Sequence, residues 1–471
     1  MTAMQLSNSS TLPRSKRAVF HLCIRSEERV ILACLAMVFT VLGIGVVNPH
    51  SLRHFAYYLC LWHGFIFLFH REDIKDFSFA FLINSACIVV YYLVQTWVFP
   101  DSYGTTSPLG SWTDDSFFYA LVADTIPADL LVRDNYDLYS HPFTNLIRCL
   151  TILSIDHPMD VIFFQSGIAA TLATFSKRFM FQLSSDRRLS NTVYVFALVC
   201  PFLMMNGGVI FIRDTFSASL LIYSLCCINS RKFFLALGAV GLQIMIRPGT
   251  ALMLFPLYAI IYYSDIKEVT RRYFAFVGVG VVLLLLCVGY IFQTVPELSE
   301  LGAGTTEGGR VTLLGRELFT GLTSNSDGNV VLLSIQELPF FIKLFLNGAY
   351  IFLYPFLSLK AAFAGEYFDL RSIMMNLVTP IYAFWLNAWF IAGALSRVRV
   401  TKKQTSIIIA VIVTLLLIGT YSLQTRQKTT IYPLYYFIVA IGFNRAPLRA
   451  RQTGYLCSFF LILLQVALNF R

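Results

Sequence analysis

The sequence predicts an all-α fold, a polytopic transmembrane helical bundle of about 12–14 helices with two long outer loops. Hydrophobic residues make up 57% of the 471 residues and charged residues only 13%, whereas soluble domains carry about 25% charged residues. The mean hydropathy is +0.67. Charged residues fall in short clusters between apolar runs of about 20 residues, the length that crosses a membrane. We therefore expect no soluble domain of any size.

The chain divides into a basic cytoplasmic tail, residues 1–29, and one multi-pass membrane domain, residues 30–471. The first apolar run, from Val30 to Val47, is followed by no small-residue cleavage site, so it predicts a membrane helix and not a removed signal peptide. Further spans are expected at residues 54–70, 77–99, 159–175, 192–212, 215–229, 233–246, 250–264, 273–293, 375–395, 405–423, 431–443 and 455–470.

The basic residues predict the orientation of the bundle. The formal net charge is +10, and most of the 36 lysines and arginines lie in alternate loops. The positive-inside rule assigns such loops, and the N-terminus with them, to the cytoplasm. Because the basic residues form neither one face nor one long run, nucleic acid is not an expected partner. A full crossing at residues 339–358 would put the cluster from Arg397 to Lys403 outside, so we expect a re-entrant or interfacial segment there.

Two long loops, residues 100–158 and 294–338, fall on the predicted outer side, where we expect any chemistry to lie. The second loop is rich in glycine and holds Arg310 and Arg316. It fits either a substrate-contacting lid or an ordinary connection, and it lacks a phosphate-loop motif. The ten cysteines show no metal-binding spacing. No cofactor or metal ligand is therefore predicted, although the use of a divalent metal stays open.

The first outer loop is acidic, and Asp114, Asp115 and Tyr119 lie at its centre. Carboxylates beside aromatic side chains near a membrane surface suit a general base or a cation ligand next to a surface that stacks on sugars. The alternative is a solvated acidic loop in which Asp114 or Asp115 caps a short interfacial helix.

Arginines at predicted outer turns form the second candidate site. Arg213, next to Asp214, and Arg247 lie there against the positive-inside bias, and Arg426 lies on the same side. An arginine between apolar helices is costly to bury unless an anion meets it, and the planar guanidinium group suits phosphate. Arg213 could instead pair with Asp214 or reach lipid headgroups. Three such arginines favour an outward-facing anion site.

Across about residues 75–440 the chain resembles the bacterial O-antigen and exopolysaccharide polymerases, the Wzy-type and EpsG-like proteins. The segments that carry the resemblance are Asp114-Asp115-Ser-Phe-Phe-Tyr119, Phe211-Ile-Arg213-Asp214, Arg247-Pro248 and Thr425-Arg426. The resemblance implies a glycosyltransferase of the GT-C class in the bacterial inner membrane, with its N-terminus in the cytoplasm. Such an enzyme joins oligosaccharide repeat units carried on undecaprenyl diphosphate at the periplasmic face.

The resemblance also implies roles for the candidate residues. Arg213 and Arg247 would act in catalysis on the donor diphosphate, with Arg426 binding it, and Asp114 or Asp115 would deprotonate or orient the acceptor hydroxyl. Tyr119, Asp214, Arg310 and Arg316 would contact substrate. The expected partners are a polyprenyl-diphosphate-linked glycan, membrane lipids, and flippase and chain-length regulator proteins. The alternatives are a transferase that adds a single sugar from a polyprenyl phosphate donor, a transporter or flippase of lipid-linked glycans, and a non-catalytic membrane scaffold.

Overall fold

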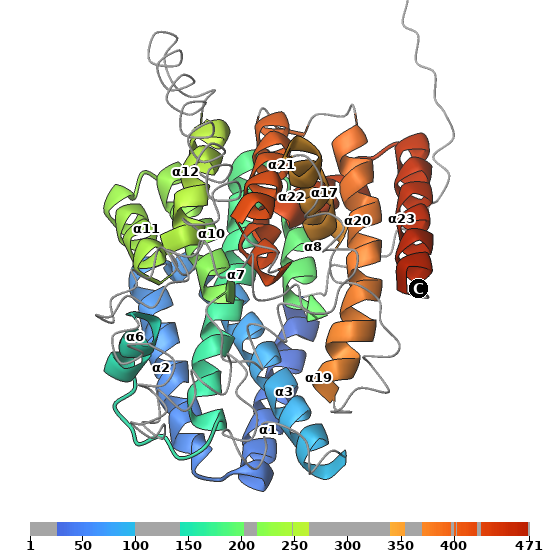
Figure 1. The fold of residues 1–471 in the computed structure, drawn as a ribbon. Coiled ribbons are helices and arrows are strands. Elements are labelled where there is room, and N and C mark those ends of the chain that lie inside the picture. Colours follow the sequence, from blue (N-terminus) through green and yellow to red (C-terminus); the bar gives the residue numbers. More distant parts are fainter. Residues whose placement is uncertain are drawn as a thin grey trace, which may run out of the picture.

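The computed structural model describes residues 26–98, 142–201, 214–246, 248–262, 340–353, 370–396, 400–401, 403–421 and 425–469. Within these ranges the chain is a bundle of helices without a β-strand (Figure 1). The predicted all-α fold is therefore confirmed. The predicted span 273–293, the outer loop 294–338 and most of the outer loop 100–158 lie outside the described residues.

The helices of the N-terminal half follow most of the predicted spans, but the helix at residues 142–150 lies within the predicted outer loop 100–158, and two helices differ from their spans in length. They are α1 Ser26–Val47, α2 Ser51–Phe69, the 3-10 helix η1 Arg71–Asp73, α3 Ile74–Val98, α6 Pro142–Leu150, α7 Met159–Ser184, α8 Arg187–Leu198, α10 Asp214–Asn229, α11 Phe233–Ile246 and α12 Pro248–Tyr262. Helix α8 ends at Leu198, short of the predicted end at residue 212. Helix α7 runs past residue 175, because the charges after that residue are paired with acidic side chains of α3 and η1 and do not end the helix.

The junction of α7 and α8 shows how the sequence ends one helix and begins the next. Ser185 adopts a left-handed conformation with φ of 53°, and its N–H donates to the Phe181 carbonyl, a common helix C-terminus. Asp186 follows as the N-cap of α8, and its carboxylate accepts the backbone N–H groups of Arg188 and Leu189. Carboxylates are among the preferred N-caps because they satisfy these unpaired donors.

The helices of the C-terminal half include four that lie where spans were predicted and one in the segment predicted to be re-entrant or interfacial. They are α17 Phe340–Leu353, α19 Leu370–Ile373, the π-helical turn η5 Met374–Val378, α20 Thr379–Leu395, α21 Gln404–Tyr421, the 3-10 helix η6 Thr425–Ile431, α22 Tyr432–Arg445 and α23 Leu448–Asn469. Helix α17 has 14 residues, which rise about 21 Å, less than the hydrocarbon core of about 30 Å. The re-entrant course of this segment stays a prediction, because residues 354–369 lie outside the described part.

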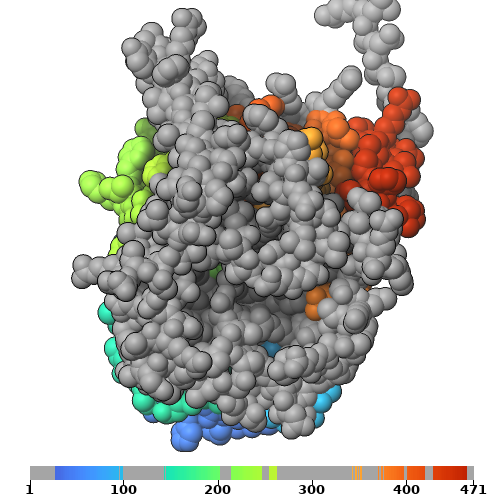
Figure 2. Space-filling view, in the orientation of Figure 1, coloured from blue at the N-terminus to red at the C-terminus, as the bar shows by residue number. Residues whose placement is uncertain are grey.

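Four helical segments of the described chain are long and apolar enough to cross a membrane: Glu27–Val47, Arg71–Val98, Met159–Ser184 and Asn376–Leu395. Large apolar side chains also point outward from the bundle. Phe234 of α11 is 92% exposed and Leu456 of α23 is 69% exposed, and Figure 2 shows these helices at opposite edges of the molecule, in yellow-green and red. Exposed apolar faces of this extent need lipid, so the bundle fits a membrane protein.

Helix α7 forms the centre of the bundle (Figure 1), and its apolar window is completely buried. Aromatic side chains attach the neighbouring helices to it. Phe163 packs edge-on against Phe55 of α2 at 5.1 Å between ring centroids, and Phe175 packs in the same way against Tyr223 of α10 at 4.9 Å. Such pairs add to the free energy gained by burying the rings.

Helices α20, α22 and α23 pack through small residues. A Cβ atom on Gly442 of α22 would collide with the Trp389 carbonyl oxygen of α20, and one on Gly454 of α23 would collide with the Ala388 carbonyl oxygen. Glycine lets two helix backbones approach closely, which is the usual way that membrane helices associate. These contacts hold α20 in the position from which it lines the candidate site.

One end of the bundle gathers charged residues from separate predicted cytoplasmic segments, and we call it the basic end. It holds Arg29, Lys177, Arg178, Lys232 and Arg445. Their partners are acidic side chains and a backbone carbonyl: Asp76 accepts from Arg29 and Lys177, Asp186 accepts from Arg445, and the Phe69 carbonyl accepts from Lys232. This clustering agrees with the prediction that these segments lie on the same side of the membrane.

Candidate functional site

A narrow pocket lies between α20, α22 and η6. It is lined by Cys200, Thr379, Tyr382, Ala383, Leu386, Asn387, Lys428, Tyr432 and Tyr435. The side chains fill it so closely that a water-sized sphere does not fit as it stands. Helix α22 begins at the pocket with Tyr432 and reaches the basic end with Arg445, so the pocket lies toward the opposite end of the bundle.

The sequence around Pro433 positions the pocket lysine. Pro433 lies in the first turn of α22, where its fixed φ and its missing N–H are tolerated. The chain ahead of it coils as the 3-10 helix η6, whose last residues turn inward: Lys428, Thr429 and Thr430 are all buried. A polar segment is thereby folded into the apolar interior of the bundle.

Lys428 is 1% exposed and is held by a backbone carbonyl and aromatic rings. Its Nζ donates to the Phe352 carbonyl of α17 at 2.6 Å. The same nitrogen lies 5.3 Å from the Phe352 ring centroid, 5.8 Å from that of Tyr432 and 5.2 Å from that of Tyr435, within the range of cation–π attraction. Burial lowers the pKa of the Lys428 ammonium to about 7, because the charged form loses its hydration.

Asn387 of α20 contributes the second polar group of the pocket. Its Oδ1 accepts the Tyr435 hydroxyl, and Tyr435 in turn stacks on Phe390 with 4.3 Å between ring centroids. These contacts fix the amide. Its Nδ2 is buried and has no hydrogen-bond partner among the described residues. Buried amide groups are normally paired, so this donor calls for an explanation.

Most of the residues predicted from the sequence to form the site lie outside the described part of the chain. These are Asp114, Asp115, Tyr119, Arg213, Arg247, Arg310 and Arg316. Asp214 is the first residue of α10 and is buried, at 1% exposure. Arg426 lies in η6, although its side chain is outside what is described. The roles assigned to these residues stay predictions.

The described backbone does bring three of the predicted turns near one another. Helix η6, which carries Arg426, contacts α10, which begins directly after Arg213. Gln243, near the end of α11, donates to the Ser217 carbonyl and hydroxyl at 3.1 and 3.0 Å, near the start of α10. The segments next to the three predicted arginines therefore meet away from the basic end.

Lys428 and Asn387 were not predicted as site residues, although both left a signal in the sequence. Lys428 belongs to the segment Thr425-Arg426-Gln427-Lys428, in which only the arginine was selected. Asn387 is an amide within an otherwise apolar span, and polar groups at such positions are often functional. The sequence does not show that the two residues line the same pocket, because their side chains come together only in the folded bundle.

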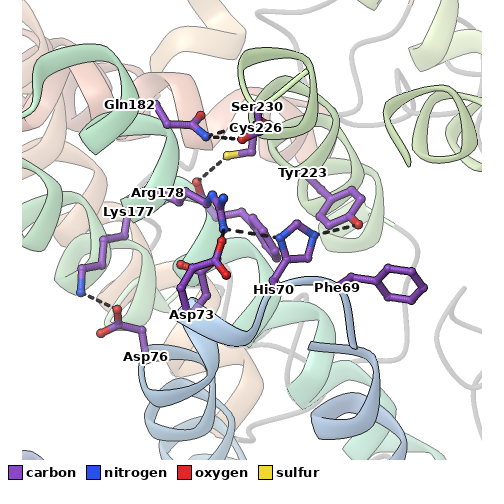
Figure 3. A network of polar contacts seen from close by, with 12 residues as sticks. Phe69, His70, Asp73, Asp76, Lys177, Arg178, Gln182, Tyr223, Cys226 and Ser230 are labelled. Carbon is purple, nitrogen blue, oxygen red and sulfur yellow. Dashed lines mark hydrogen bonds and ion pairs between the residues drawn. The ribbon is translucent and has the colours of Figure 1, made fainter. Parts of the chain in front are cut away.

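A second polar cluster, at the basic end, contains His70, Glu72 and Asp73, whose ligand atoms lie within 4.8 Å of one another. Figure 3 shows His70 and Asp73 of this cluster beside Arg178. Arg178 already fills this position: its guanidinium lies 2.7 Å from Glu72 and 3.4 Å from His70, and it also pairs with Asp73. A cation of the protein thus takes the place that a metal would need. We interpret this cluster as structural.

The fold and the pocket define an all-α helical bundle with apolar helices long enough to cross a membrane and a buried cationic pocket away from its basic end. No family model, curated protein or solved structure matches this chain. The assignment of function therefore depends on the chemistry of the residues themselves.

Proposed function

We propose that this protein is a polymerase of the bacterial inner membrane that joins undecaprenyl-diphosphate-linked oligosaccharide repeat units at the periplasmic face. One observation supports the proposal most strongly. Helix η6, with Arg426 and the buried Lys428, is folded into the bundle against α10, the helix that follows Arg213. A cation buried inside an apolar bundle suits the diphosphate of a lipid-linked donor, whose charge increases as the glycosyl group departs.

In the proposed reaction, Arg213, Arg247 and Arg426 hold the diphosphate of the donor. Their guanidinium groups provide paired donors that match phosphate oxygens and stabilise the leaving diphosphate. Asp114 or Asp115 orients the acceptor hydroxyl of the second repeat unit and takes its proton as the new glycosidic bond forms. Tyr119, Asp214, Arg310 and Arg316 are proposed substrate contacts.

The proposed orientation places the N-terminus and the basic end in the cytoplasm. Loops rich in lysine and arginine are retained on the cytoplasmic side during insertion, and the residues of the basic end come from several such loops. The pocket, at the other end of α22, then faces the periplasm, where a flippase delivers the lipid-linked repeat unit. A chain-length regulator is a further proposed partner.

Gel analysis of surface polysaccharide tests this proposal. Cells lacking the protein are complemented with wild type, Arg213→Ala or Arg247→Ala at matched membrane levels, with Arg449→Ala as the control because Arg449 is an exposed arginine at the basic end. We expect the deletion strain to lose the length ladder and keep single repeat units, and only wild type and the control to restore the ladder. An intact ladder in the deletion strain contradicts the polymerase proposal and favours single-sugar transfer or transport.

A further inference from the structure

The pocket between α20, α22 and η6 presents two hydrogen-bond donors that the fold holds in a closed apolar setting. The Asn387 Nδ2 group is buried and meets no acceptor in the described part of the chain. Asn387 lines the pocket, and the amide is fixed because its carbonyl oxygen accepts the Tyr435 hydroxyl. Lys428 provides the second donor, a buried ammonium group whose Nζ donates to the Phe352 carbonyl.

A ligand for this pocket must supply acceptors and tolerate a positive charge. Neither a lysine ammonium nor an amide NH₂ group can accept a hydrogen bond, so the complementary group is an anion with several oxygens. A phosphate group can accept from both donors at once. With the side chains as they stand, a water-sized sphere does not fit in the pocket. A phosphate group therefore enters only when the Lys428 side chain moves aside.

We propose that the Lys428–Asn387 pocket binds one phosphate group of the lipid-linked donor. This inference rests on the proposed function, since it assigns a subsite for that donor. On binding, the Lys428 ammonium turns from the Phe352 carbonyl toward the phosphate, which its flexible four-carbon stem allows. The rings of Tyr432 and Tyr435 form apolar walls that exclude water and strengthen the charged hydrogen bonds.

Binding of inorganic phosphate, farnesyl diphosphate and acetate to the purified full-length protein tests the proposal by isothermal titration calorimetry. The test variant is Lys428→Met, which keeps the length of the side chain and removes its charge. The matched control is Lys232→Met, because Lys232 also donates to a backbone carbonyl, that of Phe69 at 2.9 Å, but at the basic end. We expect Lys428→Met to bind phosphate and farnesyl diphosphate roughly ten- to hundred-fold more weakly than wild type, as the loss of a charged hydrogen bond predicts. The affinity of Lys232→Met for both ligands should equal that of wild type.

A second variant keeps the test decisive if Lys428→Met does not fold. The pair Asn387→Leu with Tyr435→Phe removes both members of the side-chain hydrogen bond together, so neither is left unpaired. It should fold as the wild type does and bind phosphate more weakly, because it removes the pocket amide. Equal phosphate affinity in wild type and variants would overturn the proposal, as would acetate binding as tightly as phosphate. Phosphate binding without farnesyl diphosphate binding would overturn the assignment to a lipid-linked donor.

The polysaccharide ladder separates this inference from the proposed function. Lys428-dependent phosphate binding in a protein whose deletion leaves the ladder intact would overturn the function and keep the phosphate site. Loss of the ladder without any Lys428-dependent binding would overturn the phosphate site and keep the function.

Discussion

Replacing Arg178 by methionine removes the guanidinium that joins the central helix α7 to the turn between α2 and α3. In the structure this group pairs with Asp73 and with the His70 ring at 3.4 Å (Figure 3). It also pairs with Glu72 at 2.7 Å. Methionine keeps most of the apolar stem of the side chain. The change therefore tests the ionic contacts more than the packing.

The size of the expected loss follows from the burial of each partner. The Glu72 carboxylate is 60% exposed, so its pair contributes about 0–1 kcal/mol. The side chains of Asp73 and Arg178 are only 15% and 17% exposed, and removing one partner of a buried pair costs about 3–5 kcal/mol. Allowing for the partial exposure, we expect Arg178→Met to lower the free energy of unfolding by about 2–3 kcal/mol.

Lys177→Met is the matched control, because Lys177 is the adjacent residue of the same helix and pairs with Asp76 at similar exposure. Asp76 keeps a second cation, Arg29 at 3.0 Å, so its carboxylate stays paired and the loss should be below about 1 kcal/mol. The free energies come from SDS titration in mixed micelles, followed by circular dichroism. Equal losses in the two variants, or no recovery when Asp73→Asn is added to Arg178→Met, would refute the reasoning.

Three further predictions concern packing and pH. Gly442→Val should lower the free energy of unfolding by about 3 kcal/mol in the same titration, because the new Cβ meets the rigid Trp389 carbonyl, whereas Gly238→Ala, with open space around it, should not. Burial and neighbouring cations lower the pKa of His70 to about 4, so thermal stability in detergent should fall as the pH drops from about 6.5 toward 4, and His70→Gln should flatten this dependence. Burial lowers the pKa of Lys428 to about 7, so phosphate affinity measured by calorimetry should be full below pH 7 and fall above it.

The helices could be predicted from the sequence because apolar runs of membrane length are a strong signal. The span 233–246 matches α11 at both ends. Helix α7 was predicted too short because Lys177 and Arg178 look like the start of a loop. In the structure Lys177 and Arg178 form ion pairs with Asp76 and Asp73 of other helices. The sequence alone does not predict such pairs between distant segments.

The pocket could not be predicted, because its members are scattered over the sequence between residues 200 and 435. Arginines at turns were selected because they violate the positive-inside bias. This bias concerns the distribution of charge along the sequence, so it can be recognised without a structure. Lys428 lies in the same segment as Arg426, and Asn387 is an amide in an apolar span, but neither signal shows that the two residues line one pocket. Their importance depends on burial and on the hydrogen bond between Asn387 and Tyr435, and both are properties of the packed bundle.

The buried polar groups of this bundle differ in whether packing alone explains them. Asp160 is buried, but its oxygens accept the Ser51 hydroxyl at 2.5 Å and the backbone N–H groups of Asp156 and His157 at 2.9 Å, so it fastens α2 to the start of α7. The Asn387 amide has no such structural use for its Nδ2 group in the described bundle, and a buried donor without an acceptor costs about 1–3 kcal/mol. A leucine would fill an apolar helix interface at no such cost. A group that makes the empty pocket less stable is explained if a ligand supplies the missing acceptor, which is the role we assign to phosphate.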